Sequence, residues 1–409
     1  NTVVGMVLLA GLFFLFFWYT NQQQKGQAEI AEKQQHIKDS TDKANALKIT
    51  PAQKEVARAD SLQRDSLGRT AKAGNFKDAA NGAEEITVVE NDLLKANFTS
   101  KGGTLKSVEL KNYKLQDSSL VLLSGGRDDK LGYSINTASN ESAETNTLYF
   151  SKAGLEKKGD SLEVISYTLT DSAGRGITHK FTVRKDSYLI DWDILLDGAD
   201  KLLSQNTMNL HYHVQMHQQQ VARVFETQQS RLYYYDEDGS DYSSAVSGVN
   251  KTFEKPLNWF SFKQQFFSTA IVAKNKFSSG NVQMTVLPDS LPQLFNASAD
   301  MKINAPASAS SAVALQLYYG PNEYGTLKKF DNGMENIVDL GSGMFSFVKY
   351  INRWIIMPVF NFFAGLIGHY GWVIALLTLF IRLVTSPLTY SSYLSGAKMK
   401  VLRPELDGL

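Results

Sequence analysis

Two long apolar stretches near the ends of the chain dominate its hydrophobic pattern. Residues 3–19 carry no charge at all, and residues 369–388 carry a single arginine, Arg382, in a mostly apolar run. A membrane-spanning helix needs roughly 20 mostly apolar residues. The pattern therefore predicts a first transmembrane helix within residues 1–20 and another over residues 369–388. For the first stretch, a secretory signal peptide is the alternative.

Charged and aromatic residues predict how the second of these helices is oriented. Tyr370 and Trp372 stand at its start, and Lys398, Lys400 and Arg403 follow its end. Aromatic rings are typical of the membrane interface, and clustered Lys and Arg residues favour the cytoplasmic side. We therefore expect the segment between the two helices to lie on the opposite, extracytoplasmic side.

Most of that intervening segment has the pattern of β-strands. Residues 84–319 contain many short runs rich in β-branched and aromatic residues, and residues 177–184 alternate apolar with polar positions. Such runs, with no long helices between them, predict an antiparallel β-sandwich. Residues 21–83 are polar and predict a partly helical tether, with disorder as the alternative. Residues 320–344 predict a short helical linker.

Residues 345–367 combine a short apolar stretch with polar residues that fall roughly on one side of a helix. The polar residues are Lys349, Asn352, Arg353 and Asn361. We interpret this segment as an amphipathic helix that lies in the membrane interface with Lys349 and Arg353 toward water. A kinked or re-entrant membrane segment is the alternative.

Arg382 is costly where the pattern places it. An arginine at the centre of a membrane helix costs about 2.5–3.5 kcal/mol on insertion scales. Either Arg382 lines a wet cavity, or its long side chain reaches the cytoplasmic surface. Thr378 lies one helical turn earlier and shares a face with Arg382. This pairing favours a groove or a bundle interior over exposure to lipid.

Composition excludes several classes of function. The chain has 42 basic and 41 acidic residues, which gives no indication of a nucleic-acid partner. It has no cysteine, so disulfides, thiolate catalysis and cysteine metal sites are excluded. No catalytic motif or cofactor fingerprint is present. We therefore expect neither an enzyme nor a bound cofactor.

Two polar clusters resemble metal sites but are incomplete. His211, His213 and His217 lie close together in sequence. A zinc site needs three or four ligands in fixed geometry, and no carboxylate completes this one, so a structural role is favoured. Residues 236–242 resemble the start of a calcium loop but lack its remaining ligands, which predicts a hairpin turn instead. We expect no metal.

The C-terminal region also resembles a known family. The matching pieces are NTVVGMVLL at the start of the chain, YGPNEYGTLKKF and GMENIVDLG before the amphipathic segment, and HYGWVIALLTLFIRLVTSPLTYSSYLSGAKMKVLRPEL from residue 369. The run T-x-x-x-R-x-x-x-x-PL followed by S-x-A-K-M-x-x-L-x-P is similar to the YidC family of bacterial membrane insertases. The N-terminal anchor followed by a large β domain is similar to the Gram-negative form, and the polar tether is similar to the Bacteroidetes-type version of it.

The resemblance implies a fold and roles for particular residues. It implies a hydrophilic groove formed by five membrane helices, with Arg382 as its central positive residue and Thr378 lining it. It implies that residues 389–409 begin a cytoplasmic helical hairpin, and that the extracytoplasmic domain is a mutarotase-like super-sandwich without an active site. Because only one of the five groove helices is present in the sequence, we expect a truncated chain.

The function implied is insertion and folding of inner-membrane proteins, without ATP hydrolysis by this chain. Its partners would be nascent membrane proteins and the lipid bilayer, with the Sec translocon and the ribosome as further candidates. The protein would be a multi-pass inner-membrane protein with its large domain in the periplasm. The alternative is a membrane-anchored periplasmic protein that binds a sugar or a protein partner. A transporter or channel is a third, less supported class.

Overall fold

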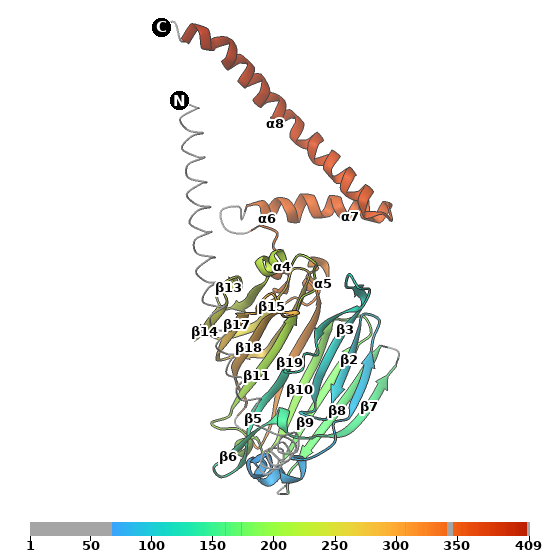
Figure 1. Cartoon of the computed structure of the whole chain (residues 1–409), viewed down its shortest axis with the longest axis vertical. Coiled ribbons are helices and arrows are strands. Elements are labelled where there is room, and N and C mark those ends of the chain that lie inside the picture. Colours follow the sequence, from blue (N-terminus) through green and yellow to red (C-terminus); the bar gives the residue numbers. More distant parts are fainter. Residues whose placement is uncertain (1–67, 160, 173, 307, 342–346, 407–409) are drawn as a thin grey trace, which may run out of the picture.

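A computed structural model describes residues 68–159, 161–172, 174–306, 308–341 and 347–406. The predicted first transmembrane helix, residues 1–20, lies outside the described residues, as do residues 21–67 of the predicted tether. Figure 1 shows a β-sandwich with a long helix, α8, that leaves from one end of it.

The strands of the described residues form three antiparallel sheets. The first has nine strands in the order β13 (Gly239–Ser244), β12 (Arg231–Asp236), β15 (Leu257–Lys263), β16 (Phe267–Phe277), β19 (Ser310–Pro321), β10 (Leu189–Asp197), β9 (Gly176–Arg184), β8 (Leu162–Thr170) and β7 (Ser151–Lys158). The second has six, β14 (Val249–Phe253), β17 (Ser279–Val286), β18 (Gln293–Asn304), β11 (Thr207–His217), β5 (Lys130–Ala138) and β6 (Glu141–Glu144). The third has four, β1 (Ile86–Glu90), β2 (Leu94–Thr99), β3 (Thr104–Lys114) and β4 (Leu120–Ser124).

Ring contacts across the core show which sheets face each other. Phe98 of β2 lies 4.9 Å from Phe181 of β9 between ring centroids, and Tyr212 of β11 lies 5.9 Å from Phe262 of β15. The nine-stranded sheet therefore covers both smaller sheets. Along β9, buried positions alternate with less buried ones, as the sequence pattern predicts for a half-buried strand. The predicted antiparallel β-sandwich is confirmed.

The described part of the predicted tether packs onto the sandwich. A short helix, η1 (Gly74–Ala79), places Phe76 in the core with 1% of its surface exposed, and Ala73 and Ala80 are buried beside it. Residues 68–83 therefore belong to the folded body, whereas the sequence placed its start at residue 84. One aromatic ring in a polar segment gives no periodicity from which this packing could be predicted.

Short helices also fill the connections. They are η2 (Thr145–Thr147), α3 (Ala199–Leu202), α4 (Arg223–Gln229), α5 (Tyr324–Lys328) and η3 (Met334–Ile337). Leu327 of α5 and Met334 and Ile337 of η3 are fully buried in the main core. The segment predicted as a linker is therefore helical, and it is anchored on the sandwich.

Three helical segments follow in the predicted amphipathic region and beyond it. They are α6 (Val348–Ile351), a π-turn η5 (Asn352–Ile356) and α7 (Met357–Leu366), and then comes α8 (Tyr370–Leu406). The wider π-turn ends two residues before Pro358, which lacks the N–H that a regular helix needs. The α6–α7 segment runs across the end of the sandwich, and α8 begins where α7 ends and points away from the sandwich (Figure 1).

Helix α8 contains the one candidate membrane span among the described residues. Tyr370–Pro387 has a mean hydropathy of 1.5, and 6% of it is buried. The length and composition agree with the predicted span over residues 369–388. The helix continues past Pro387, so the predicted span and the described part of the predicted hairpin segment form one helix. Pro387 lies inside this helix and has no N–H to donate to the carbonyl four residues earlier.

Candidate functional site

The candidate site is a line of polar side chains on one face of α8. Thr378 and Arg382 are both exposed and lie one helical turn apart, as the sequence predicts. The Thr378 hydroxyl donates a hydrogen bond of 2.8 Å to the Ile374 carbonyl of its own helix. Such a bond satisfies the hydroxyl proton inside an apolar segment and leaves oxygen lone pairs for another donor.

Two further threonines, which the sequence analysis missed, extend this face. Thr385 donates to the Ile381 carbonyl at 2.8 Å, and Thr389 donates to the Thr385 carbonyl at 2.9 Å. Positions 378, 382, 385 and 389 are spaced four, three and four residues apart, so they lie on one side of the helix. We call these four side chains the α8 stripe. The sequence already contains this helical spacing, so the stripe could have been predicted from it.

Arg382 has no acidic neighbour along its own part of the chain. No Asp or Glu occurs between Asp339 and Glu405. Within the described residues, Arg382 forms no ion pair. A carboxylate that neutralises Arg382 would therefore have to come from outside this segment.

The polar face of α6–α7 is turned toward the sandwich. Asn352 donates a 2.8 Å hydrogen bond to the Leu340 carbonyl, and Lys349 Nζ lies 3.4 Å from Asn336 Oδ1. The Arg353 guanidinium lies 5.8 Å from the centroid of the Tyr324 ring. The sequence predicted that Lys349 and Arg353 face water. In the structure they border a small cavity of about 120 Å³ between the helix and the sandwich.

The opposite face of this helix is apolar and exposed. Its large side chains are Phe347, Tyr350, Ile351, Trp354, Ile355, Phe362 and Leu366. Trp354 is 72% exposed, although its ring is one of the largest apolar surfaces available for burial. A contiguous apolar surface of this kind marks contact with a membrane or with another protein. The helix is amphipathic, as predicted.

The histidine cluster is confined to the outer face of β11. His211 Nδ1 lies 2.6 Å from Asp300 Oδ1, and its Nε2 lies 3.1 Å from the Ser134 hydroxyl. Among the described residues, no three His, Cys, Asp or Glu side chains are placed to hold a metal ion. The acidic stretch 236–242 forms the predicted hairpin, in which Asp236 pairs with Gly239.

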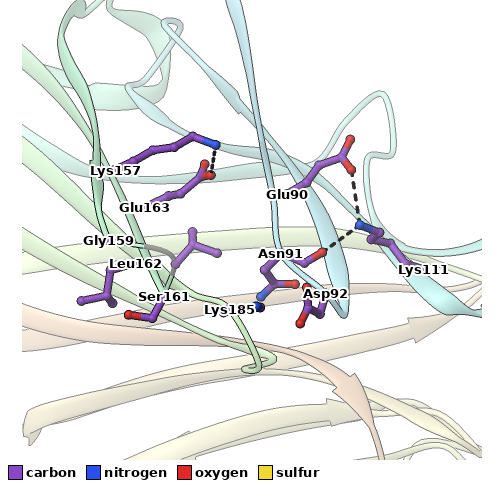
Figure 2. A pocket seen from close by; sticks show the side chains of 11 residues that line it. Glu90, Asn91, Asp92, Lys111, Lys157, Gly159, Ser161, Leu162, Glu163 and Lys185 are labelled. Carbon is purple, nitrogen blue, oxygen red and sulfur yellow. Dashed lines mark hydrogen bonds and ion pairs between the residues drawn. The ribbon is translucent and has the colours of Figure 1, made fainter.

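A cavity of about 290 Å³ is lined by the β1–β2 turn, by β3, and by the adjacent ends of β7, β8 and β9. Figure 2 shows that four of its charged side chains form ion pairs. Lys157 lies 2.6 Å from Glu163, and Lys111 lies 3.5 Å from Glu90. Three acidic and three basic side chains line the cavity, so it offers no concentrated charge of one sign for a ligand. We assign it no function.

One buried histidine went unnoticed as a titratable group. His179 is fully buried, with Nδ1 2.8 Å from the Gly103 carbonyl oxygen and Nε2 2.8 Å from the Tyr133 hydroxyl. Burial lowers the pKa of His179 to about 4, against the opposing effect of the bond to Gly103. In the alternation of residues 177–184 it shares the buried face with the apolar positions. Its role is structural.

Comparison with known proteins gives matches to two family models. The model for the YidC periplasmic domain matches residues 86–357, and the model for the 60Kd inner membrane protein matches residues 362–409. The first ends within α7, and the second covers the α8 stripe. The boundary between the two models thus falls where the chain passes from the sandwich to the candidate span.

Curated relatives match over the whole chain. A membrane protein insertase YidC from Parabacteroides distasonis is 28% identical over 430 residues, which cover 100% of this chain and 66% of the relative. One from Bacteroides fragilis is 29% identical over 421 residues, which cover 100% of this chain and 65% of the relative. The chain thus spans slightly less than two thirds of the length of these relatives.

Solved structures show only a distant likeness. A galactose mutarotase-like protein from Lactobacillus casei has a TM-score of 0.36 at 10% identity, over 57% of this chain and all of that protein. An alpha-N-acetylgalactosaminidase from Bifidobacterium bifidum has a TM-score of 0.42 at 6% identity, over 62% of this chain and 39% of that chain. Neither bears on function. The family model that matches residues 86–357, more than half of the sequence, shows that the chain belongs to the YidC family of membrane protein insertases.

Proposed function

We propose that the complete protein inserts and folds proteins of the bacterial inner membrane, and that the α8 stripe contacts the substrate. The observation that carries this proposal is Arg382. It lies in the candidate span, on the same face as three threonines, and no acidic residue of its own segment neutralises it. A guanidinium kept in such a helix at a cost of about 2.5–3.5 kcal/mol needs water or a negative partner.

The proposed mechanism is attraction followed by release into lipid. A substrate segment with acidic residues enters a water-filled groove bordered by the stripe, and Arg382 attracts it. Two opposite charges 4 Å apart gain about 4 kcal/mol at an effective dielectric constant of 20, against about 1 kcal/mol in bulk water. The apolar part of the substrate then moves into the bilayer. No covalent step and no ATP hydrolysis by this chain are involved.

In this proposal, the other parts of the chain hold α8 in place. The apolar face of α6–α7 lies in the membrane interface, where Trp and Tyr side chains are favoured. The sandwich lies in the periplasm and is joined to this helix through the contacts of Lys349, Asn352 and Arg353. Nascent membrane proteins are the partners, and the Sec translocon and the ribosome are candidates for cooperation with them.

Insertion by Arg382 variants tests this proposal. In cells depleted of the native insertase, Arg382→Ala in the complete protein is expected to impair insertion of a substrate with an acidic translocated tail at least tenfold. Arg382→Lys keeps the positive charge and is expected to retain most of the activity. The control is Leu383→Ala, on the other side of the helix. Normal insertion by Arg382→Ala at equal protein levels would refute the role of the charge.

No observation favours the alternative of an anchored periplasmic binding protein. In the described part of the chain, the cavity beside the β1–β2 turn is lined by equal numbers of acidic and basic side chains, four of which form ion pairs. The relatives that match the whole chain carry the name of an insertase.

A further inference from the structure

A second apolar surface lies on the sandwich itself, at α4 and the loops beside it. Val221 is 72% exposed, Val224 is 67% exposed and Phe225 is 49% exposed. Phe266, in the β15–β16 turn, is 50% exposed, and Leu291, in the β17–β18 loop, is 42% exposed. We call these five side chains the α4 patch. Exposed apolar side chains that gather in this way mark a contact surface.

Buried hydrogen bonds join the parts of this patch into one rigid surface. Glu226 of α4 is fully buried and accepts hydrogen bonds from the backbone N–H groups of Gln219 and Gln220 and from Gln264 Nε2, at distances of 3.0–3.1 Å. Gln264 belongs to the turn that carries Phe266. The turn and α4 are therefore held together by a carboxylate with at least three donors.

Arg223 fixes the other side of the patch. Its guanidinium donates to the backbone carbonyls of Leu287, Pro288, Leu291 and Gln293 at 2.8–3.1 Å. It also forms an ion pair of 2.9 Å with Asp289. The loop that carries Leu291 is thereby tied to α4. The apolar side chains of the patch are presented by a fixed framework.

The patch carries little charge: the β17–β18 loop contributes Asp289, which is exposed and paired with Arg223. Residues 218–230 contain two charged side chains, Arg223 and Glu226, and both are taken up by the internal bonds just described. The other polar residues of this segment are Gln, Thr and Ser. A surface that binds anionic lipids usually carries Lys and Arg on its polar side. This patch would instead bind through its apolar side chains alone.

The position of the patch identifies what covers it. Figure 1 shows α4 at the end of the sandwich from which α6–α7 and α8 leave, close to α5. The apolar face of α6–α7 and the candidate span Tyr370–Pro387 belong to the same end. The family model that covers the span is that of an inner membrane protein. With α8 across a bilayer, the patch is on the side of the sandwich that faces the lipid.

We propose that the α4 patch is a second membrane contact, which dips into the headgroup region of the bilayer beside the interfacial helix. Two separate contacts fix the tilt of the sandwich over the groove, whereas a single helix would let it pivot. Protruding valine and phenylalanine side chains suit a soft lipid surface. This proposal rests only on a membrane location and would survive if the insertase role were wrong.

The absence of cysteine from the chain permits a direct test. A nitroxide label is attached to Val224→Cys in the full chain, reconstituted into phosphatidylcholine vesicles. Its collisions with oxygen, which is enriched in lipid, are compared with those of a water-soluble nickel complex. The control is Leu195→Cys. Leu195 is also exposed, at 42%, but pairs with Ala312 near the start of β19, at the end of the sandwich away from α5.

We expect the ratio of oxygen to nickel collisions to be several-fold higher at position 224 than at position 195. In a second variant, the label is placed at Phe225→Cys and Val221→Asp is added. Removal of one apolar side chain of this size changes a partition equilibrium on the order of tenfold. The ratio at position 225 should therefore fall toward that of the control. Raising the salt concentration should leave the ratio at position 224 unchanged.

Three results would overturn the proposal. Equal ratios at positions 224 and 195 would mean that the patch stays in water. A label at 224 that is shielded from both oxygen and nickel would mean that a protein, such as a second copy of the chain, covers it. A fall of the collision ratio at position 224 at high salt would mean that charge, rather than apolar burial, holds the patch at the membrane. Unchanged circular dichroism confirms that each variant is folded.

Discussion

Protonation of His179 is expected to destabilise the sandwich as the pH falls. His179 is surrounded by aromatic side chains, with its ring 4.8 Å from Phe150 and 5.4 Å from Trp192 between centroids. One ring nitrogen lies beside the Gly103 carbonyl oxygen and the other beside the Tyr133 hydroxyl. The neutral ring satisfies both with one N–H donor and one acceptor. A charged imidazolium would present a second donor and would lack water.

The magnitude follows from the change in pKa. The pKa of His179 is about 4 in the folded protein, against 6.5 for an unperturbed histidine. The folded state therefore binds the proton more weakly than the unfolded state. This difference stabilises the fold fully above pH 6.5, and the stability is lost as the pH falls from there toward 4. A difference of two to three pKa units corresponds to about 3 kcal/mol of unfolding free energy.

Urea unfolding at pH 7.5 and at pH 4.5 measures this loss. Tryptophan fluorescence is a suitable signal because Trp192 contacts the His179 ring. We compare the unaltered protein with His179→Phe, which removes the titrating group. The variant will be less stable at pH 7.5, because it leaves the Tyr133 hydroxyl and the Gly103 carbonyl without their partner. However, between pH 7.5 and pH 4.5 the unfolding free energy of the variant should fall by about 2–3 kcal/mol less than that of the unaltered protein.

The comparison between the two proteins isolates His179 from other titrating groups. His213→Gln, altered on the outer face of β11, is the matched control and should follow the unaltered protein. If the difference in unfolding free energy between the unaltered protein and His179→Phe were the same at both pH values, the buried ring would not be the neutral group described.

Two further predictions concern the packing of the sandwich. Phe76→Ala should lower the unfolding free energy by about 3–5 kcal/mol, because it leaves a cavity in the core; a loss below 1 kcal/mol in urea unfolding would show that residues 68–83 are not part of the folded body. Glu226→Ala leaves the N–H groups of Gln219 and Gln220 and the Gln264 amide without their acceptor, and should destabilise by at least about 1–3 kcal/mol. Hydrogen exchange of α4 should then become faster, and unchanged protection would contradict the role of Glu226.

Local periodicity was sufficient to predict much of the architecture. Alternation over residues 177–184 predicted β9, because successive strand residues point to opposite faces, and His179 shares the buried face with Ile177, Phe181 and Val183. The spacing of Thr378 and Arg382 predicted their shared face on α8, because a helix repeats every 3.6 residues. These features depend only on residues that are close in sequence, so they can be predicted from the sequence alone.

Features that depend on distant contacts were not predictable in the same way. The polar side of α6–α7 was recognised, but its partners in α5 and η3 are set by how the chain folds back onto the sandwich. The expectation that Lys349 and Arg353 face water did not include these partners, because they come from distant parts of the sequence. Glu226 is a charged residue in a polar segment, and nothing local indicates that its carboxylate is buried. Only the fold brings Gln219 and Gln264 to it.

The central claim is that the α8 stripe borders water inside the membrane. In the complete protein, made free of other cysteines, Thr378→Cys and Leu383→Cys place a thiol on the stripe and on the other side of the helix. A thiol reacts with maleimides only where water allows it to ionise. A water-soluble maleimide applied to membranes opened to both sides should modify position 378 and leave position 383 unmodified. Equal protection of both positions would contradict the account, because the stripe would then face only lipid or packed protein.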